Sequence, residues 1–218
     1  MYTKEILVLL IIAYLIGSFP SSVWLGKLFC KIDVREYGSG NAGATNSFRV
    51  LGYKIGIPVL LLDVFKGWLA VSLIDFAFYF NYLQCENNFN LIDIKIALGV
   101  TAVTGHLFPI FIGFRGGKGI ATLLGFMLGI SWLCATFSLL VFIFSFVFSR
   151  FVSLSSILAS ISFPVFIFFN YEYSYEFRSL FVFSIFVPIL ALITHQKNIE
   201  RLIRGEENKA NFGKNKKS

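Results

Sequence analysis

A glycine-rich polar segment between two long apolar runs carries residue types suited to binding phosphate. It reads Gly38-Ser-Gly-Asn-Ala-Gly-Ala-Thr-Asn46 and is followed by Arg49. Glycines allow positive φ, so consecutive backbone N–H groups can converge on an anion, and a guanidinium meets phosphate oxygens as a planar fork. The alternative is a flexible polar connector. The phosphate interpretation assigns anion contacts to Gly38, Ser39, Gly40, Asn41, Gly43, Thr45, Asn46 and Arg49.

A second group of glycines and fixed charges lies between residues 105 and 122. A helix that begins after Gly119 would offer unpaired N–H groups and the positive end of its dipole to an anion beside Lys118. His106 lies inside an apolar run, where a polar group must face the protein interior. It is either a hydrogen-bonded structural group or a base or substrate ligand, and the two basic residues are either anion ligands or topogenic charges. The candidates are His106, Arg115, Gly116, Gly117, Lys118 and Thr122.

A third polar cluster follows the last apolar run, over residues 194–206. If it is helical, side chains three positions apart lie on one face and form a continuous polar surface. The alternative is a basic amphipathic helix that rests on the membrane surface. The candidates in this cluster are His195, Asn198, Arg201 and Glu206.

One acidic and one basic residue lie three positions apart inside the second apolar run. They are Asp63 and Lys66. Each alone would cost about 2.5–3.5 kcal/mol at the centre of a bilayer. The spacing therefore predicts a buried ion pair that faces the interior of a helix bundle. A proton relay, as in a transporter, is the alternative.

The composition is that of an integral membrane protein. The 218 residues are 56% hydrophobic and include 27 Phe, and only 14% are charged, against about 25% in soluble domains. We therefore predict an all-α polytopic membrane protein that forms one domain over residues 1–218. The three cysteines fit no zinc or redox spacing. The basic tail, residues 196–218, has no aromatic platform interleaved with its charges, so we expect no nucleic-acid partner.

Apolar runs of about 20 residues predict the membrane spans. The run 119–148 is too long for one ordinary helix, and Gly129 and Ser131 near its middle predict a hairpin of a short fourth and a fuller fifth span. An undivided helix there, giving six spans, is the alternative. The predicted spans of the seven-helix topology are Ile6–Phe29, Ile55–Phe80, Ile94–Phe114, two within Gly119–Phe148, Leu154–Phe169 and Leu180–Thr194.

The basic residues orient this topology. With the N-terminus outside and the C-terminal tail in the cytoplasm, 15 of the 19 Lys and Arg residues lie inside and three lie outside, which agrees with the positive-inside rule. With six spans and the tail still in the cytoplasm, five of these basic residues would lie outside: Lys31, Arg35, Arg49, Arg115 and Lys118. The favoured topology also places all three polar clusters on the cytoplasmic face, which predicts that they form one site.

The three clusters together resemble the motifs of the bacterial acyl-phosphate:glycerol-3-phosphate acyltransferases. The first segment with Arg49 is similar to the first motif of that family. The stretch from Gly105 to Thr122 is similar to the second, and the stretch from His195 to Glu206 is similar to the third. Asp63-Val-Phe-Lys-Gly67 also matches a stretch typical of the family, and the motifs occur in order from the first span to the tail.

This resemblance implies a seven-span enzyme of the bacterial inner membrane, active on its cytoplasmic side. The enzyme transfers an acyl group from acyl-phosphate to the 1-position of sn-glycerol 3-phosphate and releases lysophosphatidic acid and phosphate. Its partners would be those two substrates, membrane lipids and the enzyme that produces acyl-phosphate. Because acyl-phosphate is already activated, we expect no metal and no cofactor, and direct attack by the glycerol hydroxyl rather than an acyl-enzyme.

For that reaction we expect Ser39, Asn41 and the Gly38–Gly43 backbone to bind a phosphate. Arg49, Lys118 and Asn198 would hold glycerol 3-phosphate or the leaving phosphate. His106 would hydrogen-bond the substrate or help to remove its proton, unless the substrate's own phosphate is the base. Four catalytic candidates follow, namely Ser39, His106, Lys118 and Asn198, and the other candidates would shape the loops.

Two rival functions use the same residues. A transporter for an anionic solute would pass it along the basic clusters and the Asp63–Lys66 pair. No internal repeat relates two halves of the chain, as it does in many transporters, and the clusters gather on one face. A non-catalytic membrane scaffold would have no use for three anion-binding segments.

Overall fold

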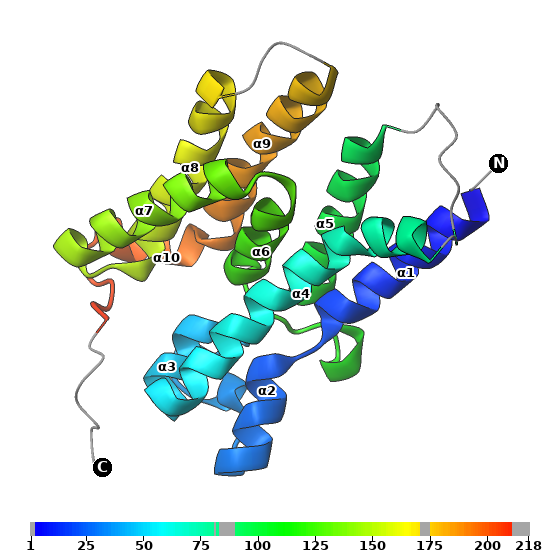
Figure 1. Cartoon of the computed structure of the whole chain (residues 1–218). Helices are drawn as coiled ribbons and strands as arrows, with labels where there is room; N and C mark the ends of the chain where they lie inside the picture. The colour runs from blue at the N-terminus through cyan, green and yellow to red at the C-terminus, as the bar shows by residue number, and fades with distance from the viewer. Residues whose placement is uncertain (1–2, 81, 83–89, 171–174, 211–218) are drawn as a thin grey trace.

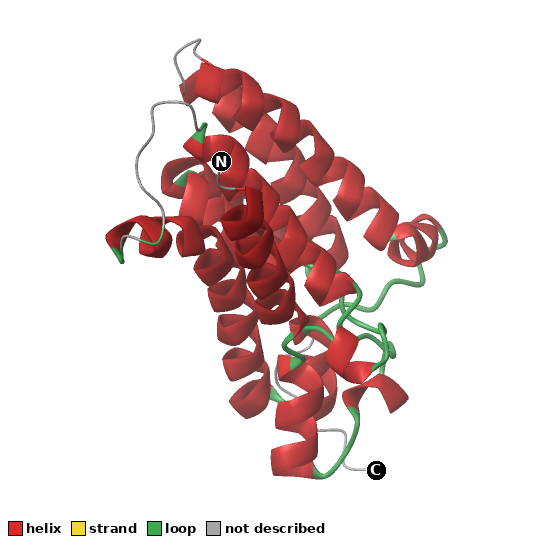
Figure 2. Cartoon of the chain, turned by 90° about the vertical axis from the view of Figure 1, so that its right-hand side faces the viewer, coloured by secondary structure: helices red, strands yellow, loops and turns green. Residues whose placement is uncertain are grey.

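The computed structural model describes residues 3–80, 82, 90–170 and 175–210. Within these ranges all regular structure is helical (Figure 2). Short π- or 3-10 turns cover Gly26–Cys30, Val34–Glu36 and Ile110–Ile112. The α-helices are α1 (Thr3–Ser18), α2 (Ser21–Leu25), α3 (Ala44–Leu51), α4 (Tyr53–Tyr79), α5 (Leu91–Leu107), α6 (Ile120–Ile130), α7 (Trp132–Ser149), α8 (Val152–Asn170), α9 (Tyr175–Thr194) and α10 (Gln196–Ile203).

The long helices form two groups that meet at α6. Helices α1, α4 and α5 pack together on one side, and α7, α8 and α9 pack on the other (Figure 1). The fully buried Phe126 of α6 joins them, because its ring lies against Gly99 of α5 and 4.8 Å from the ring of Phe183 on α9. The short helix α6 is therefore the centre of the packing.

The sequence predicts one continuous span over Ile6–Phe29. In the structure the helix of this run is broken at Phe19 and Pro20. Helix α1 ends at Ser18 and α2 begins at Ser21. Proline has no N–H to donate to the preceding turn and disfavours a helical residue before it, which explains the break. Backbone carbonyls that would lie inside one helix are thus freed for other partners. The third run breaks similarly, because α5 ends at Leu107 just before Pro109.

The predicted division of the fourth run is confirmed. Helix α6 ends at Ile130, α7 begins at Trp132, and Ser131 is the only residue between them. Both outer ends of this helix pair lie beside the C-terminal segment, since Lys118 bonds Asn198 and the carbonyl of Arg150 accepts from the N–H of Ala210. The pair is therefore a hairpin, and the undivided helix of the six-span alternative is wrong.

Six segments in the described part of the chain are long and apolar enough to cross a membrane. They make this a multi-pass membrane protein. The 11 residues of α6 rise about 16 Å, roughly half the thickness of the hydrocarbon core. A seventh complete crossing therefore stays a prediction. The six segments are Lys4–Cys30, Tyr53–Tyr79, Leu91–Ile112, Trp132–Ser149, Val152–Asn170 and Phe177–Thr194.

Two helix crossings depend on glycines that permit backbone contact. A Cβ on Gly67 of α4 would lie 2.0 Å from the carbonyl oxygen of Thr122, and one on Gly125 of α6 would lie 1.8 Å from that of Val64. A second pair, Gly17 of α1 and Gly105 of α5, brings those helices equally close. Small residues drive such close approach between membrane helices. Lys66, His106 and Thr122 all lie next to or within these crossings, so the crossings fix their spacing.

The α4–α6 crossing predicts unequal effects of two matched substitutions. Gly125→Ala should lower the free energy of unfolding by about 1–3 kcal/mol, because its methyl group meets backbone atoms that cannot move alone. Gly129→Ala in the same helix places a methyl 3.2 Å from the side chain of Val71 and should cost less. Thermal unfolding of the purified protein in detergent measures both, and equal losses would contradict the assigned contact.

Candidate active site

The first predicted loop is closed by the side chain of Asn46. This residue is 2% exposed; its Nδ2 donates to the carbonyls of Val34 and Tyr37, and its Oδ1 accepts from the N–H of Ser39 at 2.9 Å. Gly38 and Gly40 have φ of 63° and 71°, so the predicted need for glycine is confirmed at both. Gly43 is extended instead and precedes α3. Asn46 therefore shapes the loop, and the Ser39 N–H is already used within it.

The second loop folds back onto His106. The N–H groups of Gly116 and Gly117 donate to the carbonyls of Leu107 and His106, both at 3.2 Å. A Cβ on Gly117 would lie 2.1 Å from Nε2 of His106 and 3.0 Å from the carbonyl oxygen of Ala42. Glycine is needed at this position because the first loop, the second loop and the histidine meet there. The first two predicted clusters are thus in direct contact.

A buried network of polar groups lies beneath the two loops. Asp63 Oδ1 accepts from Ser21 Oγ at 2.6 Å and pairs with Lys66 Nζ at 2.9 Å. Lys66 Nζ also donates to the carbonyl of Phe19 at 3.1 Å, a carbonyl freed by the break between α1 and α2. The predicted ion pair is confirmed, and the side chains of Asp63 and Lys66 are 1% and 6% exposed.

His106 joins this network from α5. Its Nδ1 lies 3.1 Å from Thr122 Oγ1 and 3.7 Å from Asp63 Oδ1. Thr122 is fully buried, so its hydroxyl supports the histidine, and only a shift of α6 would turn it toward a ligand. The Nε2 side of the ring faces Gly117. The histidine is therefore oriented from one side and directed toward the loops on the other.

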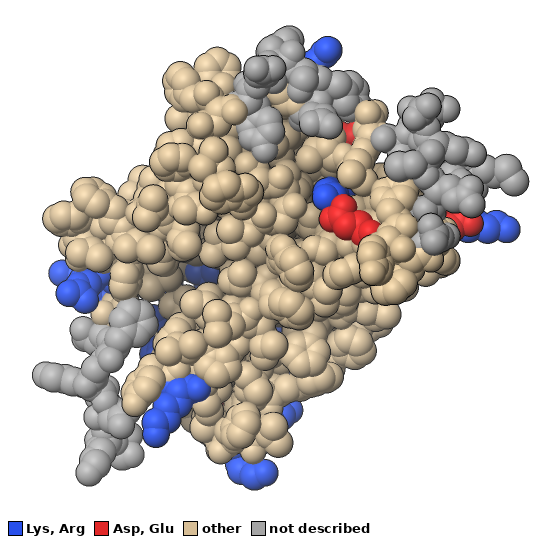
Figure 3. Space-filling model, viewed as in Figure 1, with Lys and Arg blue, Asp and Glu red and all other residues tan. Residues whose placement is uncertain are grey.

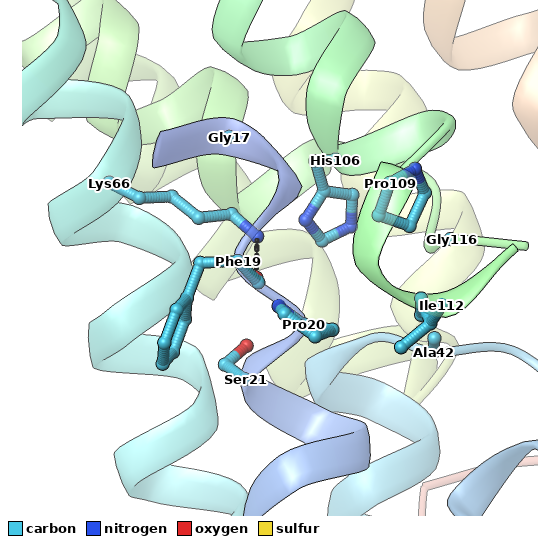
Figure 4. Close-up of a pocket in the computed structure, with 10 residues that line it drawn as sticks. All are labelled: Gly17, Phe19, Pro20, Ser21, Ala42, Lys66, His106, Pro109, Ile112 and Gly116. Atoms are coloured by element: carbon cyan, nitrogen blue, oxygen red, sulfur yellow. Dashed lines mark hydrogen bonds between the residues drawn. The ribbon is translucent and has the colours of Figure 1, made fainter. Parts of the chain in front are cut away.

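A small pocket opens between these groups. In Figure 4, Lys66 and His106 face each other across it, with Ser21 below and Gly116 on the far side. Its volume of about 10 Å³ is close to the space that one water molecule needs. The lining residues are Gly17, Phe19, Pro20, Ser21, Ala42, Lys66, His106, Pro109, Ile112 and Gly116.

A pair of charged residues ties the first loop region to the second. The Arg35 guanidinium bonds both carboxylate oxygens of Asp33 and donates to the carbonyl of Ile112 at 2.8 Å. The hydrogen bond from Arg35 holds the pKa of Asp33 well below its usual range. Because Ile112 lines the pocket, this tie fixes one wall of it.

The third cluster supplies positive charge beside the loops. Asn198 of α10 accepts a hydrogen bond from Lys118, and the charges of Arg49 and Arg201 are near enough to affect that lysine. Burial lowers the pKa of Lys118 to about 8; Glu207 opposes this effect, while Arg201 and Arg49 add to it. Figure 3 shows basic side chains set back in a hollow on the left of the molecule. All three predicted clusters therefore meet at one end of the molecule.

Glu207, which the sequence analysis did not select, anchors the third cluster. Its carboxylate accepts from Asn198 Nδ2 at 2.6 Å, Arg201 Nε at 2.7 Å and Ser153 Oγ at 2.8 Å. Burial raises the pKa of Glu207, but the three donors outweigh that effect and leave the pKa below its usual value. The selected neighbour, Glu206, is exposed. The left-handed Gly205, φ 71°, lies at the turn that carries the chain from α10 to Glu207.

His195 immediately precedes α10 and is 3% exposed. Its Nδ1 lies 2.8 Å from the carbonyl oxygen of Ala191, and a carbonyl can only accept, so Nδ1 carries the proton. Burial lowers the pKa of His195 to about 4, with a further contribution from Lys118. The imidazole is therefore neutral near pH 7, and its Nε2 is a hydrogen-bond acceptor.

The candidates fall into two groups by exposure. Ser39, Thr45, Arg49 and Arg115 are exposed at the surface of this end, where a soluble anion can reach them, while Asn41 and Arg201 are half-buried. Sequence reasoning missed Ser21 and Glu207, which join the site through the helix break and the Gly205 turn. No group of three or more His, Cys, Asp or Glu residues that could hold a metal occurs in the described ranges.

Fold and site define a polytopic helical membrane protein with a small polar pocket and a cluster of basic residues at one end of its bundle. The family model of glycerol-3-phosphate acyltransferase matches residues 7–205. Curated glycerol-3-phosphate acyltransferases from Fusobacterium nucleatum and Chlorobium chlorochromatii are 41% and 38% identical to the chain. They align with 93% and 96% of this chain, and with 97% and 98% of their own lengths.

Two solved structures agree with these matches. The glycerol 3-phosphate form of PlsY, an integral membrane glycerol 3-phosphate acyltransferase, superimposes with a TM-score of 0.81. It is 36% identical and covers 95% of this chain and 96% of its own. The lysophosphatidic acid form superimposes with a TM-score of 0.78. The chain therefore belongs to the glycerol-3-phosphate acyltransferase family.

The anchor at Glu207 predicts a contrast between two adjacent glutamates. Glu207→Ala leaves the buried Ser153 hydroxyl and the partly buried Asn198 and Arg201 donors without their acceptor, and it should lower the free energy of unfolding by about 1–2 kcal/mol. Glu206→Ala changes an exposed side chain and should stay within about 0.5 kcal/mol. Thermal unfolding in detergent distinguishes the two variants. A larger loss of stability in Glu206→Ala would show that Glu206, as the sequence predicts, is the glutamate of the third cluster.

Proposed function

We propose that this acyltransferase transfers an acyl group from acyl-phosphate to the sn-1 hydroxyl of glycerol 3-phosphate, giving lysophosphatidic acid and phosphate. The observation that carries the proposal is that a cationic surface cluster, formed by Arg49, Lys118 and Arg201, lies at the same end of the molecule as the pocket. The cluster suits a soluble phosphate, and the pocket suits the reacting centre. Family membership supports the acceptor, and the lysophosphatidic acid form of PlsY supports the lipid product.

The charges of the surface cluster fit the acceptor phosphate. Lys118, Arg49 and Arg201 carry three positive charges and Glu207 one negative charge, which leaves two positive charges for a phosphate dianion. Lys118 and Arg49 hold its oxygens in this proposal, and Ser39, Asn41 and the loop backbone add neutral donors. Asn198 sets the position of the Lys118 ammonium. The acceptor is thereby fixed with its hydroxyl end toward the pocket.

The two histidines suit the hydroxyl of the acceptor. His195 presents an acceptor nitrogen next to Lys118, which is suitable for holding a glycerol hydroxyl. His106, supported by Thr122 and Asp63, borders the pocket where the hydroxyl attacks. Either its Nε2 or the phosphate of the donor receives the hydroxyl proton. Gly116 and Gly117 keep the loop close to the histidine, and Arg115, exposed nearby, adds long-range attraction for anions.

The apolar surface of the bundle suits the acyl chain and the product. Phe19, Ile110 and Phe111 are exposed next to the pocket, so a chain whose carbonyl lies in the pocket can extend into lipid. We place this end in the cytoplasm of the bacterial inner membrane, because 15 of 19 basic residues lie on that side in the favoured orientation. A soluble acceptor and a lipid donor can then meet at one interface, next to the enzyme that makes the donor. The transporter alternative has no support from the relatives.

An activity assay tests whether acyl-phosphate is the acyl donor. The purified protein should form lysophosphatidic acid from palmitoyl phosphate and labelled glycerol 3-phosphate, and it should form none from palmitoyl-CoA under the same conditions. Thin-layer separation of the labelled lipid measures both. Product from the thioester alone would overturn the proposed donor while leaving the family assignment intact.

The lowered pKa of Lys118 predicts a pH dependence. Lys118 carries its charge below about pH 8 and loses it above, so kcat/KM for glycerol 3-phosphate should fall about tenfold per pH unit above pH 8. The second ionisation of a phosphate ester is near pH 6 and does not change in this range. In Lys118→Arg the charge persists, so its kcat/KM relative to pH 7 should stay level to pH 9. A level wild-type profile would contradict the role of Lys118.

A further inference from the structure

The Asp63–Lys66 pair is costly for the fold and is not needed to explain anion binding at the surface. Two charges inside an apolar bundle lose their hydration, and a well-packed apolar pair of similar volume is often as stable or more stable. Stability therefore gives no reason for the pair. Lys66 lies on the wall of the pocket, opposite His106, and this position suggests a chemical reason instead (Figure 4).

The ammonium of Lys66 has one unused donor. An ammonium carries three N–H bonds, and Asp63 Oδ1 and the carbonyl of Phe19 accept two of them. Both acceptors are themselves fixed, since Ser21 bonds the same carboxylate oxygen and Pro20 ends the helix after Phe19. The third N–H belongs to a side chain that lines the pocket. The group is thus preorganised to donate into the cavity.

Several unpartnered polar atoms belong to residues that neighbour the pocket lining. Among the described residues, five side-chain atoms are buried without a hydrogen-bond partner: Oε2 of Glu5 near the start of α1, and Oδ2 of Asp63, Oγ of Ser18, Oγ of Ser22 and Oδ1 of Asn41. Three of them belong to residues that are next in sequence to the pocket-lining Gly17, Ser21 and Ala42. Buried polar atoms in proteins are normally paired. The two serine hydroxyls can donate to an acceptor such as a carbonyl oxygen, whereas the Asp63 and Asn41 oxygens need a donor such as a hydroxyl.

The size of the pocket indicates which ligand group it receives. A volume of about 10 Å³ admits one small polar atom and excludes a phosphate. The walls formed by Phe19, Pro20, Pro109 and Ile112 are apolar and lead to exposed aromatic side chains. A carbonyl oxygen at the head of an acyl chain meets both conditions, whereas glycerol 3-phosphate has no apolar part.

We propose that Lys66 is a catalytic residue that donates a hydrogen bond to the carbonyl oxygen of the acyl-phosphate, with Asp63 as its positioning residue. This inference rests on the proposed function. The acceptor hydroxyl forms an ester bond to the carbonyl carbon, and the carbon–oxygen bond to phosphate breaks with its electron pair on the phosphate. The hydroxyl proton ends on the released phosphate. Negative charge grows on the carbonyl oxygen during attack, and the fixed ammonium stabilises it.

A binding experiment with two ligands tests the contact. A 2-oxoalkyl phosphonate keeps the carbonyl of the donor but cannot transfer its acyl group, and an alkyl phosphonate of equal length lacks the carbonyl. Wild-type protein should bind the first about tenfold or more tightly than the second, as expected for a hydrogen bond from a charged donor. The double variant Asp63→Leu/Lys66→Met should lose this preference. Equal binding by wild type, or a preference retained in the variant, would overturn the proposal.

The double variant also separates catalysis from folding. It removes both charges together, which relieves their desolvation but leaves the Phe19 carbonyl and the Ser21 hydroxyl without partners, so it should still fold and should unfold at a temperature near that of the wild type. Its kcat should fall at least a hundredfold, while KM for glycerol 3-phosphate changes less than threefold. A folded variant with wild-type kcat would show that the pair is only structural. Failure of the proposed donor is a separate result, since wild type would then form no product from acyl-phosphate.

Discussion

The ion pair between Asp63 and Lys66 is the constraint on which the arrangement of the site depends. A buried charge pair needs further hydrogen bonds, and the chain supplies them by breaking its first long helix at Pro20. That break frees the carbonyl of Phe19 for the ammonium and turns the hydroxyl of Ser21 toward the carboxylate. A sequence able to form one long span thus forms the two helices α1 and α2. The pocket lies at the break between them.

The glycine crossings bring the other half of the site to this pair. Gly67 and Gly125 let α4 and α6 touch along their backbones, and Gly105 does the same for α5 against α1. His106 is thereby placed within reach of both Asp63 and Thr122. The cationic cluster is built differently: Lys118, Asn198 and Glu207 are linked by side-chain hydrogen bonds from separate segments. The buried part is therefore set by helix packing and the outer part by polar contacts.

Sequence patterns predicted the membrane class, the three clusters, the division at Ser131 and the Asp63–Lys66 pair. Each follows from a local rule about hydropathy, glycine or charge burial. The details that escaped prediction depend on backbone direction. Which of Glu206 and Glu207 faces inward is decided by the left-handed turn at Gly205, and Asn46 bonds its own loop because that loop folds back over α3. Ser21 joins the site only because the helix breaks before it.

The central claim is that Lys66 contacts the acyl carbonyl at the reacting centre, and infrared spectroscopy measures that contact most directly. A hydrogen bond from a cation weakens a carbonyl bond and lowers its stretching frequency. Bound 2-oxoalkyl phosphonate with a ¹³C-labelled carbonyl should show a lower frequency in the wild type than in the Asp63→Leu/Lys66→Met variant. The same frequency in both proteins, with the ligand bound in each, would contradict the account.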